Sequence, residues 1–200
     1  MSNTNYNFEQ LKQQLHENFT RGKSPEDVAY AEKRFTHTLG VVETAEKLAK
    51  MYGADVEKAR VAALLHDCAK FYKYEDFARK HDIKLDYDIL KHLKVIHSFL
   101  GVFVAKIEYG IEDEEILGAI KYHTTGKPDM TVLEKIVYLA DAIEPGREEY
   151  GYLEEGRKLA CEDLDKAVGF ILERTIKYVE ERKLKLCYLT KEAYEWYSKK

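Results

Sequence analysis

The sequence predicts an all-α protein, folded as a single helical bundle. Apolar residues recur at the spacing of an α-helix through most of the chain, and no segment alternates between apolar and polar residues as a half-buried strand does. Hydrophobic residues form 45% of the 200 positions, which is enough for a buried core, and 34% are charged, as expected for a solvated surface. With only three prolines and eleven glycines to break helices, the connections should be short.

The first two helices are predicted by an apolar stripe and by a helix-start motif. The stripe consists of four residues at helical spacing: Phe8, Leu11, Leu15 and Phe19. The motif is "GKSPED", in which Ser24 can cap the helix and Pro25 takes its first position. This second helix should run to about Tyr52, because Gly53 suits the position just after a helix C-terminus.

The rest of the chain continues with the same period. A third helix should open near Asp55 and carry the stretch "VAALLHD", and a short one is expected in "YEDFARKH". Residues 95–109 and 113–123 should form two more, followed by the loop "HTTGKPDMT" and a helix "VLEKIVYLADAIE" capped by Thr131. After a break at "EPGREEYG", a long helix is expected over 163–183 and a terminal one in "TKEAYEWYSKK".

These elements are expected to form one domain with three parts. Residues 1–23 form an N-terminal helix, residues 24–150 form the core, and residues 151–200 form a C-terminal helical extension of the same domain. We expect the aromatic residues of the last part, Tyr188, Tyr194 and Trp196, to pack on the long helix, with stacking on a nucleoside as the alternative. A possible homodimer is left open by the aromatic residues Tyr150, Tyr152 and Trp196, which an interface could use.

Composition limits the classes of partner and compartment. The net charge of −4 gives no strongly basic face, so binding to nucleic acid is not expected. Cys68, Cys161 and Cys187 are widely spaced and form no CxxC pair, which argues against a disulfide framework or a zinc finger and fits a reducing cytoplasm. The sequence has no signal-peptide pattern and no apolar run near the roughly 18 residues of a membrane span. We therefore expect a cytoplasmic protein with no membrane partner.

The stretch "VAALLHDCAK" places a histidine and a carboxylate at the end of the most hydrophobic helix. Burying His66 and Asp67 without partners would cost several kcal/mol, on the order given for unpaired polar groups. Four further groups lie at helix ends or on apolar faces: His37, His97, His123 and Asp141. By contrast, the remaining histidines lie in polar surroundings and should be solvated: His16, His81 and His92.

Each of these six groups alone is most simply a hydrogen-bonded core residue, and Asp141 alone could pair with a lysine. Together they need mutual partners, and neutral imidazole with carboxylate is a ligand set for a first-row transition metal. Adjacent helical residues point about 100° apart. An ion shared by His66 and Asp67 would therefore lie near a helix end and face other helices, from which His37 and Asp141 can come.

Four stretches of the sequence carry a family resemblance: "RFTHTLGV", "ALLHDCAK", "HTTG" and "DMTVLEKIVYLADAIEPGR". They resemble the HD-domain metal-dependent phosphohydrolases and, among these, the symmetrical diadenosine tetraphosphate hydrolases of the YqeK type. The resemblance covers roughly residues 24–150. It implies hydrolysis of diadenosine tetraphosphate to two ADP, at one or two metal ions held by His37, His66, Asp67 and Asp141. Iron is the usual metal, and manganese, cobalt and magnesium also suit such ligands.

The same resemblance implies roles in catalysis for Asp67, His97 and His123. His97 and His123 would either bind a second metal or contact the phosphates, one of them protonating the leaving ADP. The sequence leaves both alternatives open. A bound metal would polarise a phosphoryl oxygen and lower the pKa of water, and the protein would contribute positioning and charge stabilisation.

Positive side chains should line the path of the phosphates. Arg34 lies three residues before His37, hence on nearly the same helix face, and Lys70 lies about one turn beyond His66. Arg147 follows the break after Asp141, whereas Lys73 is equally consistent with a solvated surface residue.

Three further residues are predicted to contact substrate. Thr124 can offer a hydroxyl and an amide to phosphate. Phe71 and Tyr72 could stack a base, although an ordinary core position is equally consistent with either.

Other functions remain compatible with the residues. An HD protein can hydrolyse a mononucleotide, a deoxynucleoside triphosphate, a cyclic nucleotide or a guanosine alarmone instead. A non-catalytic module that senses a nucleotide is a second alternative, and a helical interaction domain without metal is a third. The "HTTGKPD" and "ADAIEPGR" stretches favour diadenosine tetraphosphate.

Overall fold

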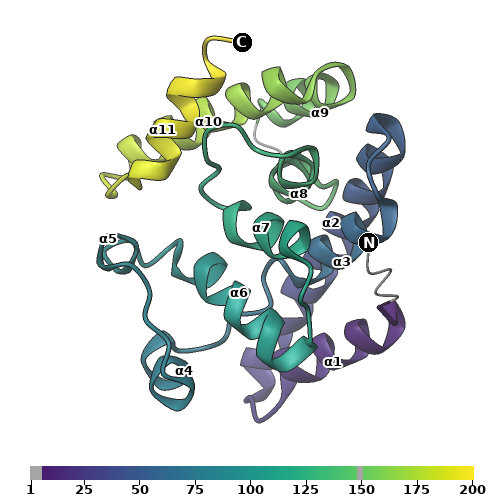
Figure 1. Cartoon of the computed structure of the whole chain (residues 1–200), viewed down its shortest axis with the longest axis vertical. Coiled ribbons are helices and arrows are strands. Elements are labelled where there is room, and N and C mark those ends of the chain that lie inside the picture. Colours follow the sequence, from purple (N-terminus) through teal and green to yellow (C-terminus); the bar gives the residue numbers. More distant parts are fainter. Residues whose placement is uncertain (1–5, 148–150) are drawn as a thin grey trace.

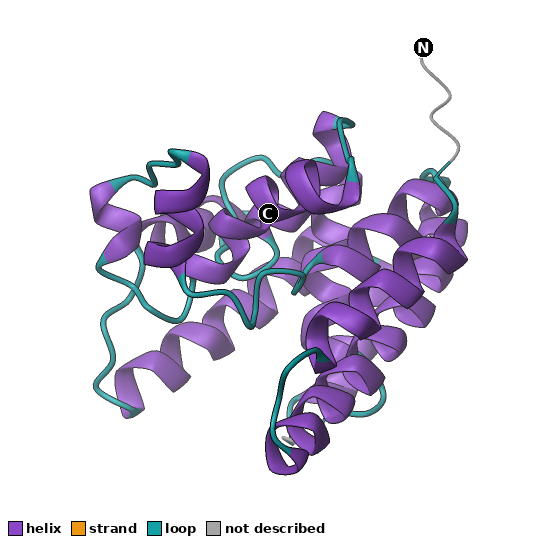
Figure 2. Ribbon diagram, turned by 90° about the horizontal axis from the view of Figure 1, so that it is seen from below, coloured by secondary structure: helices purple, strands orange, loops and turns teal. Residues whose placement is uncertain are grey.

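The computed structural model describes residues 6–147 and 151–200, and all regular structure in that part of the chain is helical (Figures 1 and 2). The predicted all-α class is therefore confirmed. The described helices are α1 (Phe8–Thr20), α2 (Pro25–Tyr52), α3 (Val56–Leu65), α4 (Tyr74–His81), α5 (Tyr87–Leu90), α6 (Ile96–Tyr109), α7 (Glu114–Tyr122), α8 (Val132–Ile143), α9 (Leu153–Glu162), α10 (Leu164–Glu181) and α11 (Tyr188–Tyr197).

The helix boundaries follow the capping residues. The Ser24 side chain accepts a hydrogen bond from the Asp27 amide at the start of α2, and Pro25 occupies the first turn. Thr131 and Glu134 form a reciprocal capping box at the start of α8. The helix α2 ends at Gly53, whose φ of 64° lies in the left-handed region that glycine adopts without strain. These boundaries confirm the expected ones.

Two helices were not predicted. The helix α5 is a single turn, and α9 follows directly on the break at "EPGREEYG". The helix α9 carries no side-chain cap, and its buried residues are one leucine and two small residues: Leu153, Gly156 and Ala160. It therefore lacks both the cap and the apolar stripe by which a helix is identified in a sequence.

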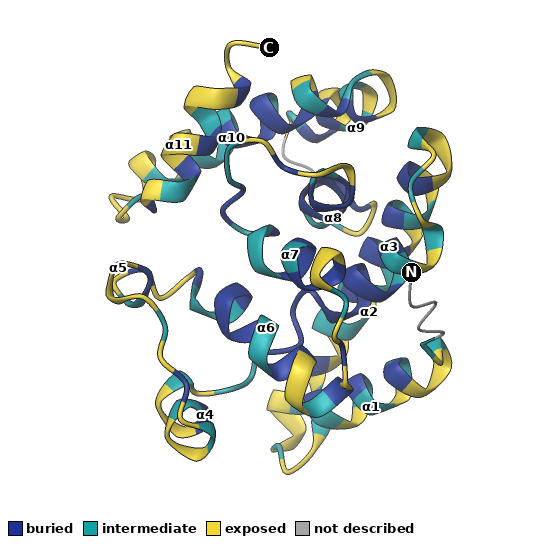
Figure 3. Cartoon of the chain, viewed as in Figure 1, coloured by how far each residue is buried: buried dark blue, intermediate teal, exposed yellow. Residues whose placement is uncertain are grey.

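The core lies where α3, α7 and α8 meet. The helix α2 packs along α3 and α8, α7 packs between α6 and α8, and α10 packs against α8, α9 and α11. Figure 3 shows buried residues concentrated on α3, α7 and α8, whereas α4 and α5 lie at the periphery and are largely exposed. The helix pairs around α3 thus bring together segments that lie far apart in the sequence.

The C-terminal aromatic residues are placed differently from one another. Tyr197 is buried, and its hydroxyl accepts a hydrogen bond from the Met130 amide at 2.8 Å. Tyr194 packs against the core, but Tyr188 and Trp196 are 43% and 40% exposed, so the expectation that all three would pack on α10 is wrong for these two. Of the other aromatic residues considered for an interface, Tyr152 is half-buried. Tyr150 lies outside the described residues.

The prediction for the three outlying histidines also needs correction. His16 is partly exposed and pairs with Glu32 at 2.8 Å, as a solvated histidine can. His92, however, is buried, and its Nδ1 lies 3.2 Å from the Lys185 carbonyl oxygen. His81 packs its ring on Phe77 at a centroid distance of 4.4 Å. The His92 contact joins residues 93 positions apart, whereas His81 and Phe77 lie one helical turn apart in a helix that the sequence predicts. None of the described helices is long and apolar enough to span a membrane.

Candidate metal centre

The end of α3 positions His66 and Asp67. The preceding residues of α3, from Val61 to Leu65, are all buried, and each leucine contributes about 1.5–3 kcal/mol by its burial. The turn that follows is therefore fixed against the core. The His66 Nδ1 lies 2.6 Å from the carbonyl oxygen of Ala63, to which it donates. In the neutral imidazole the other nitrogen, Nε2, then carries no proton, and its lone pair can bind a metal.

The helices α2 and α8 bring His37 and Asp141 to the same point. The His37 Nε2 lies 3.0 Å from Asp141 Oδ1. The His66 Nε2 lies 3.8 Å from the same oxygen and 3.6 Å from Asp67 Oδ2. The four side chains for which the sequence predicts metal binding therefore converge, although they come from two helices, α2 and α8, and from the turn after α3.

The helices α6 and α7 add two further histidines. His123 follows the last residue of α7 and donates from Nδ1 to the Ile120 carbonyl oxygen at 2.7 Å. Its Nε2 lies 3.3 Å from His97 Nε2. The Oδ1 atom of Asp67 lies 3.2 Å from His97 Nε2 and 3.7 Å from His123 Nε2. Asp67 thus stands between two sets of histidines, and a carboxylate can bridge two metal ions.

Three overlapping groups of these side chains have the spacing of a metal site. Within each group the donor atoms lie within 4.8 Å of one another: His37, His66 and Asp67; His66, His123 and Asp141; and Asp67, His97 and His123. A transition metal bound at about 2.0–2.2 Å from each ligand joins donor atoms separated by up to about 4 Å.

Two buried atoms of the cluster lack a hydrogen-bond partner, although the Lys70 ammonium lies 3.5 Å from one of them, Asp67 Oδ1. His66 Nε2 and Asp67 Oδ1 are both buried and accept no hydrogen bond. Unpaired buried polar atoms of this kind are costly, and a cation among them would satisfy both. The donor chemistry, the spacing and these two atoms together fit a divalent metal.

Burial sets the protonation of the cluster. It lowers the pKa of His66 and His97 well below the ordinary value and that of His123 to about 4, so all three are neutral near pH 7. For Asp141, burial would raise the pKa, but Arg147 and the hydrogen bond with His37 outweigh it and hold that pKa well below its usual range. His66, His97 and His123 therefore present neutral imidazoles and Asp141 an ionised carboxylate, the forms in which these residues bind metals.

The three cations with the strongest sequence prediction lie at this cluster. Arg34 donates to Asp67 Oδ2. Arg147 donates to the Asp141 carboxylate at 2.6 Å and to the Asp141 carbonyl oxygen at 2.8 Å. Lys70 Nζ lies 3.3 Å from His97 Nε2, and burial lowers the pKa of Lys70 to about 8.

Of the other residues predicted to contact substrate, some lie at the cluster and some do not. The Thr124 hydroxyl lies 3.0 Å from His123 Nε2 and 3.3 Å from His97 Nε2, so it belongs to the cluster. Tyr72 lines a pocket beside Lys70 and His97. Phe71 instead packs edge-on against Phe19, with a centroid distance of 4.9 Å. Lys73 is exposed at the start of α4 and is not brought to the cluster by any described contact.

Glu144 is a site residue that the sequence reading missed. It is 3% exposed, and its Oε1 lies 3.0 Å from His37 Nδ1, which fixes the histidine with Nε2 toward Asp141. Its Oε2 accepts from the Gly146 amide at 2.5 Å. A Cβ atom at Gly40 would lie 2.6 Å from that oxygen, so only glycine leaves room for the carboxylate. The signal was present in "ADAIEPGR" as an acid at a helix end, but its partner lies 107 residues away.

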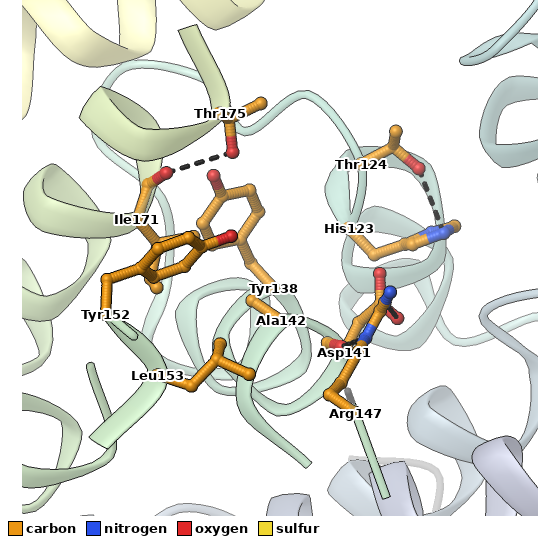
Figure 4. Close-up of a pocket in the computed structure, with 10 residues that line it drawn as sticks. All are labelled: His123, Thr124, Tyr138, Asp141, Ala142, Arg147, Tyr152, Leu153, Ile171 and Thr175. Atoms are coloured by element: carbon orange, nitrogen blue, oxygen red, sulfur yellow. Dashed lines mark hydrogen bonds and ion pairs between the residues drawn. The ribbon is translucent and has the colours of Figure 1, made fainter. Parts of the chain in front are cut away.

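A pocket of about 180 Å³ opens directly beside the cluster, between α7, α8, α9 and α10. Figure 4 shows its two walls: Tyr138, Tyr152 and Thr175 lie on one side, across from the cluster residues. The cluster side is formed by His123, Thr124, Asp141 and Arg147. We refer to it as the α8–α10 pocket. It joins an aromatic wall to a wall of metal-binding and cationic groups.

A helical fold with a His/Asp cluster at the junction of its helices defines the class of protein. Residues 34–146 match the family model of the HD domain, and the chain belongs to this family. The matched segment begins at Arg34, a predicted substrate-binding residue, and contains His37, both members of the His66–Asp67 pair and Asp141. The predicted resemblance to HD-domain proteins is thereby confirmed.

Individual relatives narrow the comparison. The chain is 45% identical over 150 residues to a symmetrical bis(5'-nucleosyl)-tetraphosphatase of Halalkalibacterium halodurans. The aligned region covers 74% of this chain and 80% of that protein. It is 42% identical over 156 residues to the protein of the same name from Bacillus subtilis, with 76% and 82% covered.

A solved structure covers nearly the whole chain. It is a protein of Clostridium acetobutylicum described as a predicted HD superfamily hydrolase involved in NAD metabolism. It is 38% identical, has a TM-score of 0.84 and covers 98% of this chain and 99% of its own. The helices outside the matched HD segment therefore also have counterparts in that protein.

Proposed function

We propose that the protein is a metal-dependent hydrolase that cleaves diadenosine tetraphosphate symmetrically into two ADP. The observation that carries this proposal is the convergence of His37, His66, Asp67 and Asp141 on one point, with cations around it. The two relatives named symmetrical bis(5'-nucleosyl)-tetraphosphatase support the choice of substrate. In the reaction, a water oxygen bonds to one of the two central phosphorus atoms, the central anhydride P–O bond breaks, and the bridging oxygen leaves with the other ADP.

The chain's own residues would hold the polyphosphate and the metal ligands in place. A metal ion bound by His37, His66, Asp67 and Asp141 would supply a Lewis acid for the phosphoryl group and for water. Arg34 and Arg147 each contact one of the two ligand carboxylates, so they stand where phosphate oxygens would approach the metal. Lys70, with a pKa of about 8, is protonated at neutral pH and adds a third positive charge.

The structure favours one of the two roles considered for His97 and His123. Burial lowers the pKa of both, to about 4 for His123, so neither is protonated at neutral pH. A neutral imidazole whose Nε2 faces Asp67 suits a ligand better than a proton donor. We propose that both, together with Asp67, would hold a second metal ion; Asp67 also belongs to the ligand group of His37 and His66. Asp67 would thereby take part in catalysis.

Iron is our proposal for the metal, with manganese, cobalt and magnesium as alternatives. Element analysis of freshly purified protein tests it, and metal add-back after chelation identifies the ion that supports turnover. We also propose a cytoplasmic location, supported by the free thiols of Cys68, Cys161 and Cys187. A homodimer would use the exposed Trp196, and sedimentation velocity tests it.

The substrate is tested by product analysis. Metal-loaded protein incubated with diadenosine tetraphosphate should give ADP as the sole nucleotide product, and chelation should stop the reaction. ATP with AMP as products would contradict symmetrical cleavage. No turnover of this compound, with turnover of a mononucleotide or a guanosine alarmone, would favour another HD phosphohydrolase. Binding without any turnover would favour a sensing module.

A further inference from the structure

A second pocket lies on the other side of the cluster. It has a volume of about 320 Å³ and lies between the start of α4 and the start of α6. Its lining includes Lys70, Tyr72, Tyr74, Leu93, Lys94 and His97. We refer to it as the α4–α6 pocket. The two pockets share no lining residue, and Figure 1 shows α4 and α6 below α7, with α8, α9 and α10 above it.

Each pocket adjoins its own part of the metal centre. The α8–α10 pocket includes His123 and Asp141. The α4–α6 pocket includes His97, whose Nε2 lies 3.2 Å from Asp67 Oδ1 and 3.3 Å from His123 Nε2. If one molecule occupied both pockets, the part that joins its two ends would therefore lie at the metal centre.

The walls of the α4–α6 pocket are suited to a flat apolar ring. Tyr72 is held edge-on against Phe77 at a centroid distance of 5.3 Å, and the Tyr74 hydroxyl accepts from the Leu85 amide at 3.2 Å. At the rim, Leu93 is 81% exposed, more than any other large apolar residue of the described chain. Lys94 follows it and is also exposed. An exposed leucine beside fixed aromatic rings is a surface that a purine base can cover.

The substrate of the proposed function has two identical ends, and the chain does not. Symmetrical cleavage requires one adenosine on each side of the broken bond, at the same distance of two phosphates. The sequence contains no internal repeat that would build two identical nucleoside sites. The two pockets flank the metal centre but differ in every lining residue.

We infer that the α4–α6 pocket binds one adenosine of the dinucleotide while the α8–α10 pocket binds the other. Two chemically different surfaces thereby recognise two identical halves. This inference rests on the proposed function, because it takes diadenosine tetraphosphate as the substrate. It assigns to Tyr74, Leu93 and Lys94 a role in binding substrate, which the motifs of the sequence do not indicate.

The test compares two exposed apolar residues of the same region. Leu93→Ser removes the apolar rim of the α4–α6 pocket, and Ile107→Ser is the matched control, because Ile107 is 46% exposed on α6 and lines neither pocket. Both positions are exposed, so both variants should fold. Leu93→Ser should raise KM for diadenosine tetraphosphate about tenfold, the loss expected when a leucine is no longer covered, with kcat within about twofold. Ile107→Ser should leave both constants unchanged.

A variant of the other pocket completes the test. Tyr152→Ala should also raise KM, and the effects of Tyr152→Ala and Leu93→Ser should multiply in the double variant, since the pockets share no residue. If Leu93→Ser behaves like Ile107→Ser while the wild type still produces ADP, the inference is wrong and the proposed function stands. If the wild type leaves diadenosine tetraphosphate intact, both are wrong.

Discussion

The histidines of the metal centre are held in two different ways. His66 and His123 each donate from Nδ1 to a carbonyl oxygen three residues earlier in their own segment, at 2.6 and 2.7 Å. His37 is instead held by the carboxylate of Glu144, which comes from the end of another helix. Local anchoring needs only a helix end, whereas the anchoring of His37 needs the packing of α2 against α8. The first kind is therefore less sensitive to distant substitutions than the second.

The largest effect should come from His66 and Asp67, which each belong to two of the three ligand groups. His66→Ala or Asp67→Ala should abolish both bound metal and ADP formation, since each removes a donor from two of the three ligand groups. Element analysis and a product assay measure this, with circular dichroism to confirm that the variants remain helical. A variant that retains its full metal content and activity would contradict the assignment.

The next largest effect should come from the residues that anchor His37, and it separates the two kinds of anchoring. Glu144→Ala should weaken metal binding by about 10–100-fold, as the loss of a carboxylate behind a ligand histidine does. Gly40→Ala should act in the same direction, because its Cβ would displace the carboxylate. Competition with a chromogenic chelator measures the affinity.

Glu43→Gln is the control for Glu144, because Glu43 is exposed and lines, together with His37 and Glu144, one groove beside α2. It should leave metal affinity unchanged. Equal losses in Glu43→Gln and Glu144→Ala would show that charge in the groove, and not contact with His37, is responsible.

A smaller effect should distinguish two neighbouring lysines. Lys70 lies 3.3 Å from His97 Nε2, whereas Lys73 is exposed at the start of α4. Lys70→Ala should lower kcat/KM about tenfold or more, as for the loss of one charge-stabilising group, and Lys73→Ala should stay within about twofold. Steady-state kinetics at fixed ionic strength measures both. A comparable loss in Lys73→Ala would place the phosphate path differently.

The smallest effect concerns the stability of the metal-free protein. Burial lowers the pKa of His123 to about 4, below the ordinary value of about 6.5 in an unfolded chain. The unfolded chain therefore takes up this proton first. The contribution to stability is complete above about pH 6.5 and is lost as the pH falls toward 4, by up to about 1.4 kcal/mol per pH unit for one group.

Urea unfolding of chelator-treated protein at pH 7, 6 and 5 measures this dependence. His123→Asn should show a shallower decrease in the free energy of unfolding than the wild type. His16→Gln should match the wild type, because His16 is partly exposed and its ring contacts Glu32 and Phe35, outside the cluster. An unfolding free energy that is the same at pH 7 and pH 5 would contradict the buried neutral state of His123.

Patterns among residues that are close in the sequence predicted most of the fold and the part of the site at the end of α3. The caps at Ser24 and Thr131 set the boundaries of α2 and α8, and the step from buried leucines to His66–Asp67 indicated the cluster. Glu144 and the buried His92 were missed, because each depends on a partner about a hundred residues away. The pocket walls depend in the same way on how α4, α6 and α8–α10 are arranged, which no local pattern records.

The most direct test of the metal centre is anomalous diffraction from crystals of the iron-loaded protein, recorded at the iron absorption edge. We predict a peak bonded to His37 Nε2, His66 Nε2 and the carboxylates of Asp67 and Asp141. A peak bound elsewhere, or iron that leaves His37 or Asp141 without a bond to it, would contradict the central claim.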